Sequence, residues 1–327
     1  MSILLNGELK LDWKPSTSEK GEFIRQDSQF RNWVTVDGQA GPGGEAGFKA
    51  EKGRYQLYIS HACPWAHRTI IFRKLKNLED IISVSVVSPD MGPEGWKFGG
   101  FEQATQDHIH GYEYMYQVYQ QTSPNYSGIV TVPVLYDKKN KTIVNNESSE
   151  IIRMFNSAFN EITGDNQDFY PAPLRKDIDE INEFVYHAIN NGVYRTGFAS
   201  SQDAYERAFV KLFDALDEVE QRLSGQRYLV GAELTEADWR LFTTLIRFDH
   251  VYVGHFKCNR RRIVDYPNLS NYLRELYQYE GISETVNMNH IKRHYYWSHP
   301  SINPTRIVPA GPEIDFSLAH DRALLST

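Results

Sequence analysis

Cys63 is the residue of this sequence whose type and position most clearly permit chemistry. It lies within Leu57–Arg68, where a strand-like run stops at the thiol and Pro64 opens a helix-like run. Aligned peptide dipoles and unpaired N–H groups at a helix N-terminus favour a thiolate over a thiol. Proline suits the first helical position because its missing N–H would be unpaired there. We therefore predict that Cys63 is a nucleophile.

A neighbouring thiol that could resolve a mixed disulfide on Cys63 is missing. The CxxC motif of a dithiol oxidoreductase would place a cysteine where this chain has Ala66, so an external thiol is expected to do this work. Cys258 is predicted to pack as a small apolar residue. His67 and Arg68 lie in the first turn of the predicted helix, where they either lower the pKa of the thiol further or are solvated surface residues.

The segments around Cys63 follow the order of a thioredoxin-type layer. Alternation from Arg54, a helical pattern that runs to Leu78 and a β-branched run at 81–87 form a βαβ unit. Residues 131–144 then read as a hairpin, which a helix follows. The order βαβ and then ββα predicts an α/β layer of this type. Within it, Val132–Pro133 is a candidate cis peptide.

Three residues of this layer are suited to holding a peptide-like ligand. The residue before a cis-proline, here Val132, offers its backbone N–H and C=O to an extended peptide. Glu147 would pair with an α-ammonium, while Ser148 and the helix N-terminus would receive an α-carboxylate. These groups are the ends of a γ-glutamyl residue. Simple helix capping by 147–150 is the alternative, and the presence of the cysteine favours the ligand site.

The remaining sequence suggests two further regions. Residues 1–50 lack periodicity and are predicted to wrap a core as an extended N-terminal arm. Past residues 169–173 only helical patterns occur, and Thr235–Asp238 is a capping box that begins a buried helix. The predicted domains are the arm over 1–50, a thioredoxin-like domain over 51–160, and an all-α domain with a C-terminal tail over 171–327.

Composition narrows the possible partners and sites. The 327 residues carry 35 basic and 42 acidic side chains, a formal charge of −7, which disfavours nucleic acid and anionic membranes. Two cysteines fit a reducing compartment, and with no signal-like start or membrane span the predicted location is cytoplasmic. A metal site is not predicted, because His108 and His110 do not share a helix face, and His290 and His294 lack the zincin glutamate and an obvious third ligand.

The combination of these features resembles the glutathione transferase superfamily and, within it, the glutathionyl-hydroquinone reductases of the Xi class. The resemblance covers nearly the whole chain. The motifs that carry it are Ala62–Thr69, Ser83–Val87, Gly95-Trp96, Thr131–Val134, Asn146–Ser148, Ile151–Asn156, Asn190–Tyr194, Leu234–Asp238, Tyr252–Cys258 and Ile302–Pro304.

The resemblance implies a thioredoxin-like N-terminal domain followed by an all-helical glutathione-transferase C-terminal domain, in a homodimer. It also implies that glutathione is the co-substrate and that no metal takes part. The implied roles are Cys63 as nucleophile, Trp96, Val132, Glu147 and Ser148 around glutathione, and Tyr194, Tyr252 and Tyr295 around an aromatic substrate, with the adjacent Tyr296 as the alternative to Tyr295.

The expected activity is glutathione-dependent reduction of glutathionyl-hydroquinones to hydroquinones through a mixed disulfide between Cys63 and glutathione. An Omega-like thioltransferase or dehydroascorbate reductase would use the same thiol on another acceptor. A non-catalytic transferase-like binding module is a third reading, against which the intact cysteine argues.

Overall fold

The computed structural model describes residues 2–11 and 16–325, which form two compact units. Of the described residues, the first unit contains 2–11, 26–167 and 285–306, and the second contains 16–25, 168–284 and 307–325. This division differs from the linear boundaries predicted at residues 50, 160 and 171. Residues 16–25 bond within the second unit, where Ser200 N donates to Gly21 O at 3.0 Å, and residues 285–306 bond within the first, where Arg293 Nε donates to Asp90 Oδ1 at 2.6 Å.

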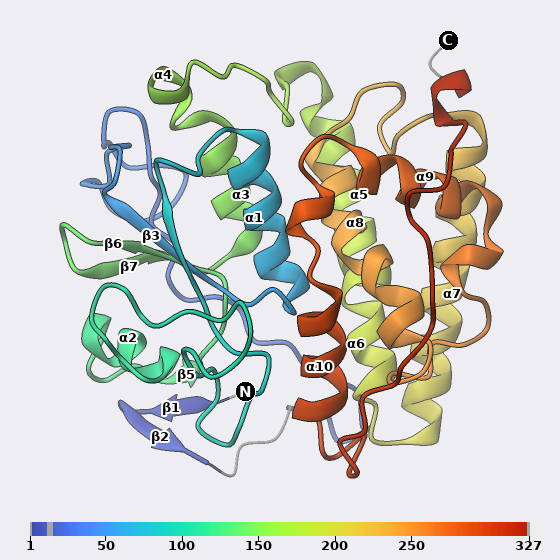
Figure 1. Cartoon of the computed structure of the whole chain (residues 1–327), viewed down its shortest axis with the longest axis horizontal. Coiled ribbons are helices and arrows are strands. Elements are labelled where there is room, and N and C mark those ends of the chain that lie inside the picture. Colours follow the sequence, from blue (N-terminus) through green and yellow to red (C-terminus); the bar gives the residue numbers. More distant parts are fainter. Residues whose placement is uncertain (1, 12–15, 326–327) are drawn as a thin grey trace. The chain divides into compact units, whose positions relative to one another are not determined.

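The first unit contains a four-stranded sheet in the order β4-β3-β6-β7 (Figure 1). β3 (Tyr55–Ile59) runs parallel to β4 (Ser83–Val86) and antiparallel to β6 (Val134–Asp137), which pairs antiparallel with β7 (Thr142–Asn145). Helices α1 (Pro64–Leu75) and α3 (Ser148–Ser157) pack against each other. The predicted thioredoxin-like layer, hairpin and cis Val132–Pro133 peptide are confirmed.

The helix that follows β3 is shorter than its sequence pattern suggested. α1 ends at Leu75, and Asn77 adopts a φ of +54° in the turn that follows. Leu78 therefore lies beyond the helix, although its side chain is fully buried. The apolar pattern in the sequence continued past the end of the helix because the turn places the Leu78 side chain in the same core as the apolar face of α1.

Part of the N-terminal arm is regular, which the prediction of an extended arm did not include. β1 (Ile3–Leu5) pairs with β2 (Glu8–Lys10) and with β5 (Gly128–Ile129) in a separate three-stranded sheet. Asn6 and Gly7 join β1 to β2 with φ values of +50° and +78°, the left-handed conformations that a two-residue hairpin turn requires. An Asn-Gly dipeptide is the sequence signal for such a turn.

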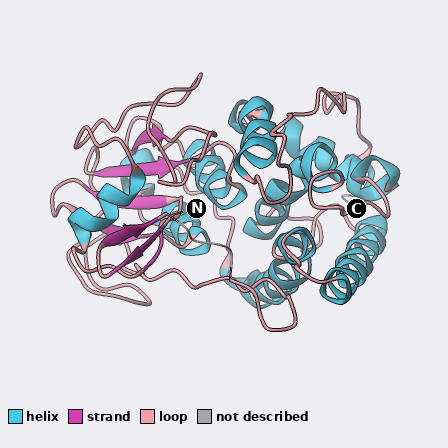
Figure 2. Ribbon diagram, turned by 90° about the horizontal axis from the view of Figure 1, so that it is seen from below, coloured by secondary structure: helices cyan, strands magenta, loops and turns pink. Residues whose placement is uncertain are grey.

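The second unit is helical, as predicted, and the described strands all lie in the first unit (Figure 2). Its longer helices are α5 (Arg175–Val185), α6 (Gly192–Gly197), α7 (Gln202–Gly225), α8 (Glu236–Arg247) and α9 (Pro267–Gln278), with π-helical turns at Tyr186–Asn190 and Phe248–Tyr252. In the described ranges, none of the helices is apolar over a length that would cross a membrane.

The predicted capping box is present at the start of α8, where every residue is buried. Thr235 N and Thr235 Oγ1 donate to Asp238 Oδ2 at 2.9 and 3.2 Å. Leu229 N and the Tyr272 hydroxyl donate to Asp238 Oδ1, each at 2.8 Å. The cap therefore joins α8 to α9 and to the preceding loop as well as ending its own helix.

Helix α10 (Met288–Ser298) follows the helical unit in sequence but belongs to the first unit. Arg293 forms two hydrogen bonds with Asp90, at 2.6 and 2.8 Å, and Met91 N donates to Ser298 Oγ at 3.0 Å. α10 thereby holds the loop after β4, the loop that leads to Trp96.

Candidate active site

Cys63 is the N-cap residue of α1, with Pro64 in the first turn, as the sequence predicted. Its backbone is extended (φ −74°, ψ 121°), and its carbonyl accepts the hydrogen bond from His67 N at 2.9 Å. The first turn of α1 contains no acidic residue. The helix dipole and the N–H groups of this turn therefore favour a negative charge on the sulfur.

The fold brings Cys63 to Val132, which lies 69 residues further along the chain. The half-buried thiol donates from Sγ to Val132 O at 3.4 Å. Val132 immediately precedes the cis-proline that leads into β6. The predicted nucleophile thus adjoins the backbone of Val132, as the predicted ligand site requires.

Glu147 caps the N-terminus of α3, and the adjacent Ser148 is buried. Glu147 Oε1 accepts hydrogen bonds from Ser149 N at 3.0 Å and from Ser149 Oγ at 2.8 Å. Arg68 Nη1 donates to Ser148 Oγ at 3.5 Å, which links α1 to the start of α3. Glu147 therefore does cap its helix, and the cap presents a carboxylate at the helix start in the unit that holds Cys63.

The reading of His67 and Arg68 as solvated residues is wrong. Both side chains are buried, because the face of α1 that carries them packs inward. His67 Nε2 lies 2.8 Å from Thr285 Oγ1, and the Arg68 guanidinium lies 4.5 Å from the centre of the Trp65 ring. The Arg68 guanidinium is thus held between α1 and α3.

Trp96 is a buried side chain whose indole N–H has no hydrogen-bond partner among the described residues. Its ring stacks on the His294 ring, with centroids 4.7 Å apart and planes 21° apart. His294 Nδ1 lies 2.9 Å from Pro89 O. A buried donor without a partner is costly, so the indole N–H is a natural contact point for a ligand.

The three predicted substrate tyrosines belong to two units. Tyr194 and Tyr252 lie in the helical unit with ring centroids 6.3 Å apart, whereas Tyr295 lies in the unit of Cys63. Tyr252 is fully buried, and the Arg25 guanidinium lies 4.9 Å from the Tyr194 ring centre. Tyr295 and Tyr296 are both buried, so burial does not separate them.

Ser28, in the N-terminal arm, adjoins the site and was not predicted. Its hydroxyl lies 3.2 Å from Glu147 Oε2. The arm segment around it has no periodicity, and no local motif in the sequence marks this serine.

The other groups considered for chemistry have structural roles. Cys258 is completely buried, and burial raises the pKa of its thiol. His290 Nε2 lies 2.6 Å from Glu102 O, and His294 bonds to Pro89. Within the described part of the chain, no group of three or more His, Cys, Asp or Glu side chains is arranged to hold a metal ion.

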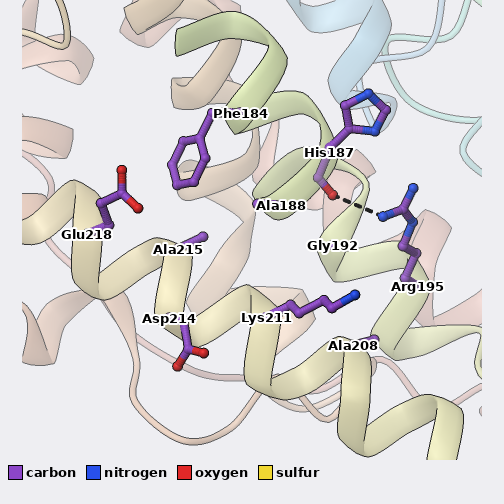
Figure 3. Close-up of a pocket in the computed structure, with 10 residues that line it drawn as sticks. All are labelled: Phe184, His187, Ala188, Gly192, Arg195, Ala208, Lys211, Asp214, Ala215 and Glu218. Atoms are coloured by element: carbon purple, nitrogen blue, oxygen red, sulfur yellow. Dashed lines mark hydrogen bonds between the residues drawn. The ribbon is translucent and has the colours of Figure 1, made fainter. Parts of the chain in front are cut away.

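A cavity of about 350 Å³ lies in the helical unit between α7 and the segment from α5 to α6 (Figure 3). Phe184, Ala188 and Ala215 line it together with the charged Arg195 and Lys211. Neither Tyr194 nor Tyr252 is among its lining residues. The cavity is therefore distinct from the predicted tyrosine cluster.

Comparison with known proteins identifies two domain families. The protein-family model described as glutathione S-transferase, N-terminal domain, matches residues 62–158. The family model of the corresponding C-terminal domain matches residues 202–275. The chain is 54% identical to glutathionyl-hydroquinone reductase YqjG of Escherichia coli K-12, over 98% of both chains. The glutathione-bound structure of YqjG matches with a TM-score of 0.89 at 56% identity, over 90% of this chain and 96% of that one. A Xi class GST from Natrialba magadii matches with a TM-score of 0.91 at 48% identity, over 99% and 97%.

Proposed function

The chain belongs to the glutathione transferase superfamily and, within it, to the glutathionyl-hydroquinone reductases of the Xi class, and we propose that it reduces glutathionyl-hydroquinones to hydroquinones with glutathione as reductant. The observation that carries the proposal is the placement of Cys63 Sγ at the start of α1, 3.4 Å from Val132 O. The choice of substrate is supported by the 54% identity to YqjG, which is named a glutathionyl-hydroquinone reductase.

In the first step, the Cys63 thiolate attacks the sulfur of the glutathionyl-hydroquinone. An S–S bond forms between Cys63 and glutathione, and the bond between that sulfur and the ring carbon breaks. Ring carbon is a poor leaving group, so the substrate reacts as its keto tautomer, in which this carbon already carries a proton. The electron pair then moves onto the ring oxygen, which a phenolic hydroxyl stabilises and protonates. The product is the hydroquinone.

In the second step, the thiolate of another glutathione attacks the glutathionyl sulfur of the mixed disulfide. Oxidised glutathione leaves, and the Cys63 thiolate is restored. The two electrons gained by the aromatic ring come from two thiols, which end as one disulfide. The reaction balances without a metal or a bound redox cofactor.

Four residues are assigned to glutathione. Glu147 pairs with the α-ammonium, and Ser148 with the amides at the start of α3 receives the α-carboxylate. Val132 offers its backbone to the cysteinyl part of the tripeptide, and Trp96 offers its indole N–H. These roles agree with the burial and hydrogen bonding described above.

Tyr194, Tyr252 and Tyr295 are assigned to the hydroquinone ring. Their hydroxyls would bond the substrate oxygens and favour the keto tautomer. Replacing each by phenylalanine removes the hydroxyl while keeping the ring. Turnover is expected to fall in all three variants, and an unchanged rate would remove that tyrosine from the assignment.

The decisive experiment compares wild type with Cys63→Ser on a panel of glutathionyl-hydroquinones. We expect Cys63→Ser to lose turnover while its affinity for glutathione, measured by calorimetry, stays near wild type. Full activity of Cys63→Ser would reject the mechanism. Faster turnover of a small mixed disulfide or dehydroascorbate than of every conjugate would instead identify an Omega-like thioltransferase or dehydroascorbate reductase.

The enzyme is further proposed to be a cytoplasmic homodimer, since its chemistry requires a supply of reduced glutathione and the family resemblance implies two subunits. Light scattering of the purified protein measures the subunit number directly.

A further inference from the structure

The N-terminal arm contacts the start of α3 through several polar bonds. Phe30 N donates to Asn146 Oδ1, and Asn146 N donates to Phe30 O, both at 3.1 Å. Arg31 Nε donates to Glu150 Oε2 at 2.7 Å. Asn32 N donates to Val144 O at 3.0 Å. The arm therefore lies beside the end of β7 and the first turn of α3 in a fixed register.

Within this contact, Ser28 reaches the carboxylate assigned to the glutathione ammonium. Ser28 Oγ lies 3.2 Å from Glu147 Oε2 and 3.1 Å from Asn146 O, so these two acceptors share its single proton. The other oxygen, Oε1, accepts from Ser149 N and Ser149 Oγ. The carboxylate is thus held on one side by its own helix and on the other by the arm.

The backbone beside the carboxylate is held as well. Asn145 Oδ1 accepts from Glu147 N at 2.7 Å, while Asn145 Nδ2 donates to Glu150 Oε2 at 2.7 Å and to Asn32 O at 3.0 Å. These bonds orient the main chain of Glu147. Its carboxylate is contacted by Ser149 at Oε1 and by Ser28 at Oε2.

We propose that Ser28 is a positioning residue for Glu147, and that the arm in this way sets the affinity of the site for the ammonium end of a γ-glutamyl ligand. The inference rests on the proposed function, which assigns Glu147 to that ammonium. An ion pair is strongest when its carboxylate is oriented before the ligand binds, because the ligand then does not bear the cost of ordering it. Removal of the Ser28 hydroxyl leaves Oε2 without this donor.

The test measures glutathione affinity by calorimetry in Ser28→Ala, Ser28→Thr and the matched control Thr35→Ala. Thr35 lies in the same arm, and its hydroxyl donates to Gln39 O at 2.8 Å, away from α3. We expect Ser28→Ala to weaken glutathione binding by about threefold to tenfold. Ser28→Thr, which keeps a hydroxyl, and Thr35→Ala should bind as wild type does.

A second ligand separates positioning of Glu147 from general support of the fold. In desamino-glutathione a hydrogen replaces the α-ammonium, so this analogue makes no ion pair with Glu147. Its affinity should be the same in wild type and Ser28→Ala. Equal weakening of both ligands, or undiminished glutathione binding by Ser28→Ala, would overturn the proposal. Loss of glutathione affinity in Glu147→Gln together with wild-type affinity in Ser28→Ala would reject the role of Ser28 alone and leave the reductase function intact.

Discussion

The capping box of α8 offers a stability test whose size follows from its hydrogen bonds. Asp238 is fully buried and accepts from two backbone N–H groups, of Leu229 and Thr235, and from two hydroxyls, of Thr235 and Tyr272. In Asp238→Ala the hydroxyls can rotate toward other acceptors, but the two N–H groups cannot. Each buried donor left unpaired costs about 1–3 kcal/mol. The free energy of unfolding should therefore fall by about 2–6 kcal/mol at pH 7.

Comparison with the isosteric variant Asp238→Asn isolates the pH dependence of stability that the Asp238 carboxyl contributes. Burial raises the pKa of Asp238 from its ordinary value of 3.8 to about 6, although its hydrogen bonds lower it. Because the folded-state pKa is above the unfolded one, the folded protein binds more protons between about pH 4 and 6. Wild-type stability from this group therefore falls as pH rises through that window. Asparagine does not titrate.

Urea unfolding of wild type and Asp238→Asn at pH 7 and pH 4.5 measures the difference. Linkage predicts that wild type gains about 2 kcal/mol relative to the asparagine variant on going to pH 4.5. A difference between the two proteins that is independent of pH would contradict the raised pKa of Asp238. An Asp238→Ala variant as stable as wild type would contradict the role given to the cap.

Three other outcomes are expected. Arg54→Met should lose about 3–5 kcal/mol of stability in urea, because it strips the buried Asp137 of an ion pair; a loss below 1 kcal/mol would show that the pair is dispensable. Iodoacetamide at pH 6 should label Cys63 in the native protein and Cys258 only after unfolding, as mapped by mass spectrometry, since Cys258 is fully buried; rapid native labelling of Cys258 would contradict this burial. His294→Ala should raise KM for glutathione about threefold with little change in kcat, while His294→Phe, which keeps the stacked ring, should remain close to wild type; equal effects of the two variants would argue against stacking on Trp96.

Local patterns in the sequence were sufficient for the elements that carry Cys63 and Glu147. The order of strands and helices, the proline after Cys63 and the capping box at Thr235 depend on residues a few positions apart. Such signals are visible because backbone hydrogen bonding and apolar burial repeat along a helix or strand. The Asn6-Gly7 hairpin was also within reach, since this dipeptide favours the required positive φ values.

The residues that the sequence did not reveal act across long separations. Ser28 contacts the Glu147 carboxylate, 119 positions away. A single serine in a segment without periodicity gives no sequence pattern from which this contact could be predicted. The sequence did not reveal the burial of Arg68 for the same reason, because its partner Ser148 belongs to another helix, 80 positions away. Propensity cannot distinguish an arginine directed to solvent from one that bridges two helices. Only the packing of α1 against α3 decides it.

Helix α10 shows why chain order is a poor guide to which residues share a unit. Its apolar spacing marks a helix, but its attachment to the loop after β4 uses polar contacts of Arg293, His294 and Ser298. Such contacts form only because the chain, after the helical unit, comes back to the first unit. In the sequence, many other arginines and histidines are equally suited to polar contacts of this kind. The stack on Trp96 and the inclusion of Tyr295 in the same unit as Cys63 both follow from that return. Residues assigned to the two substrates are therefore separated by long stretches of sequence, and no single motif contains the site.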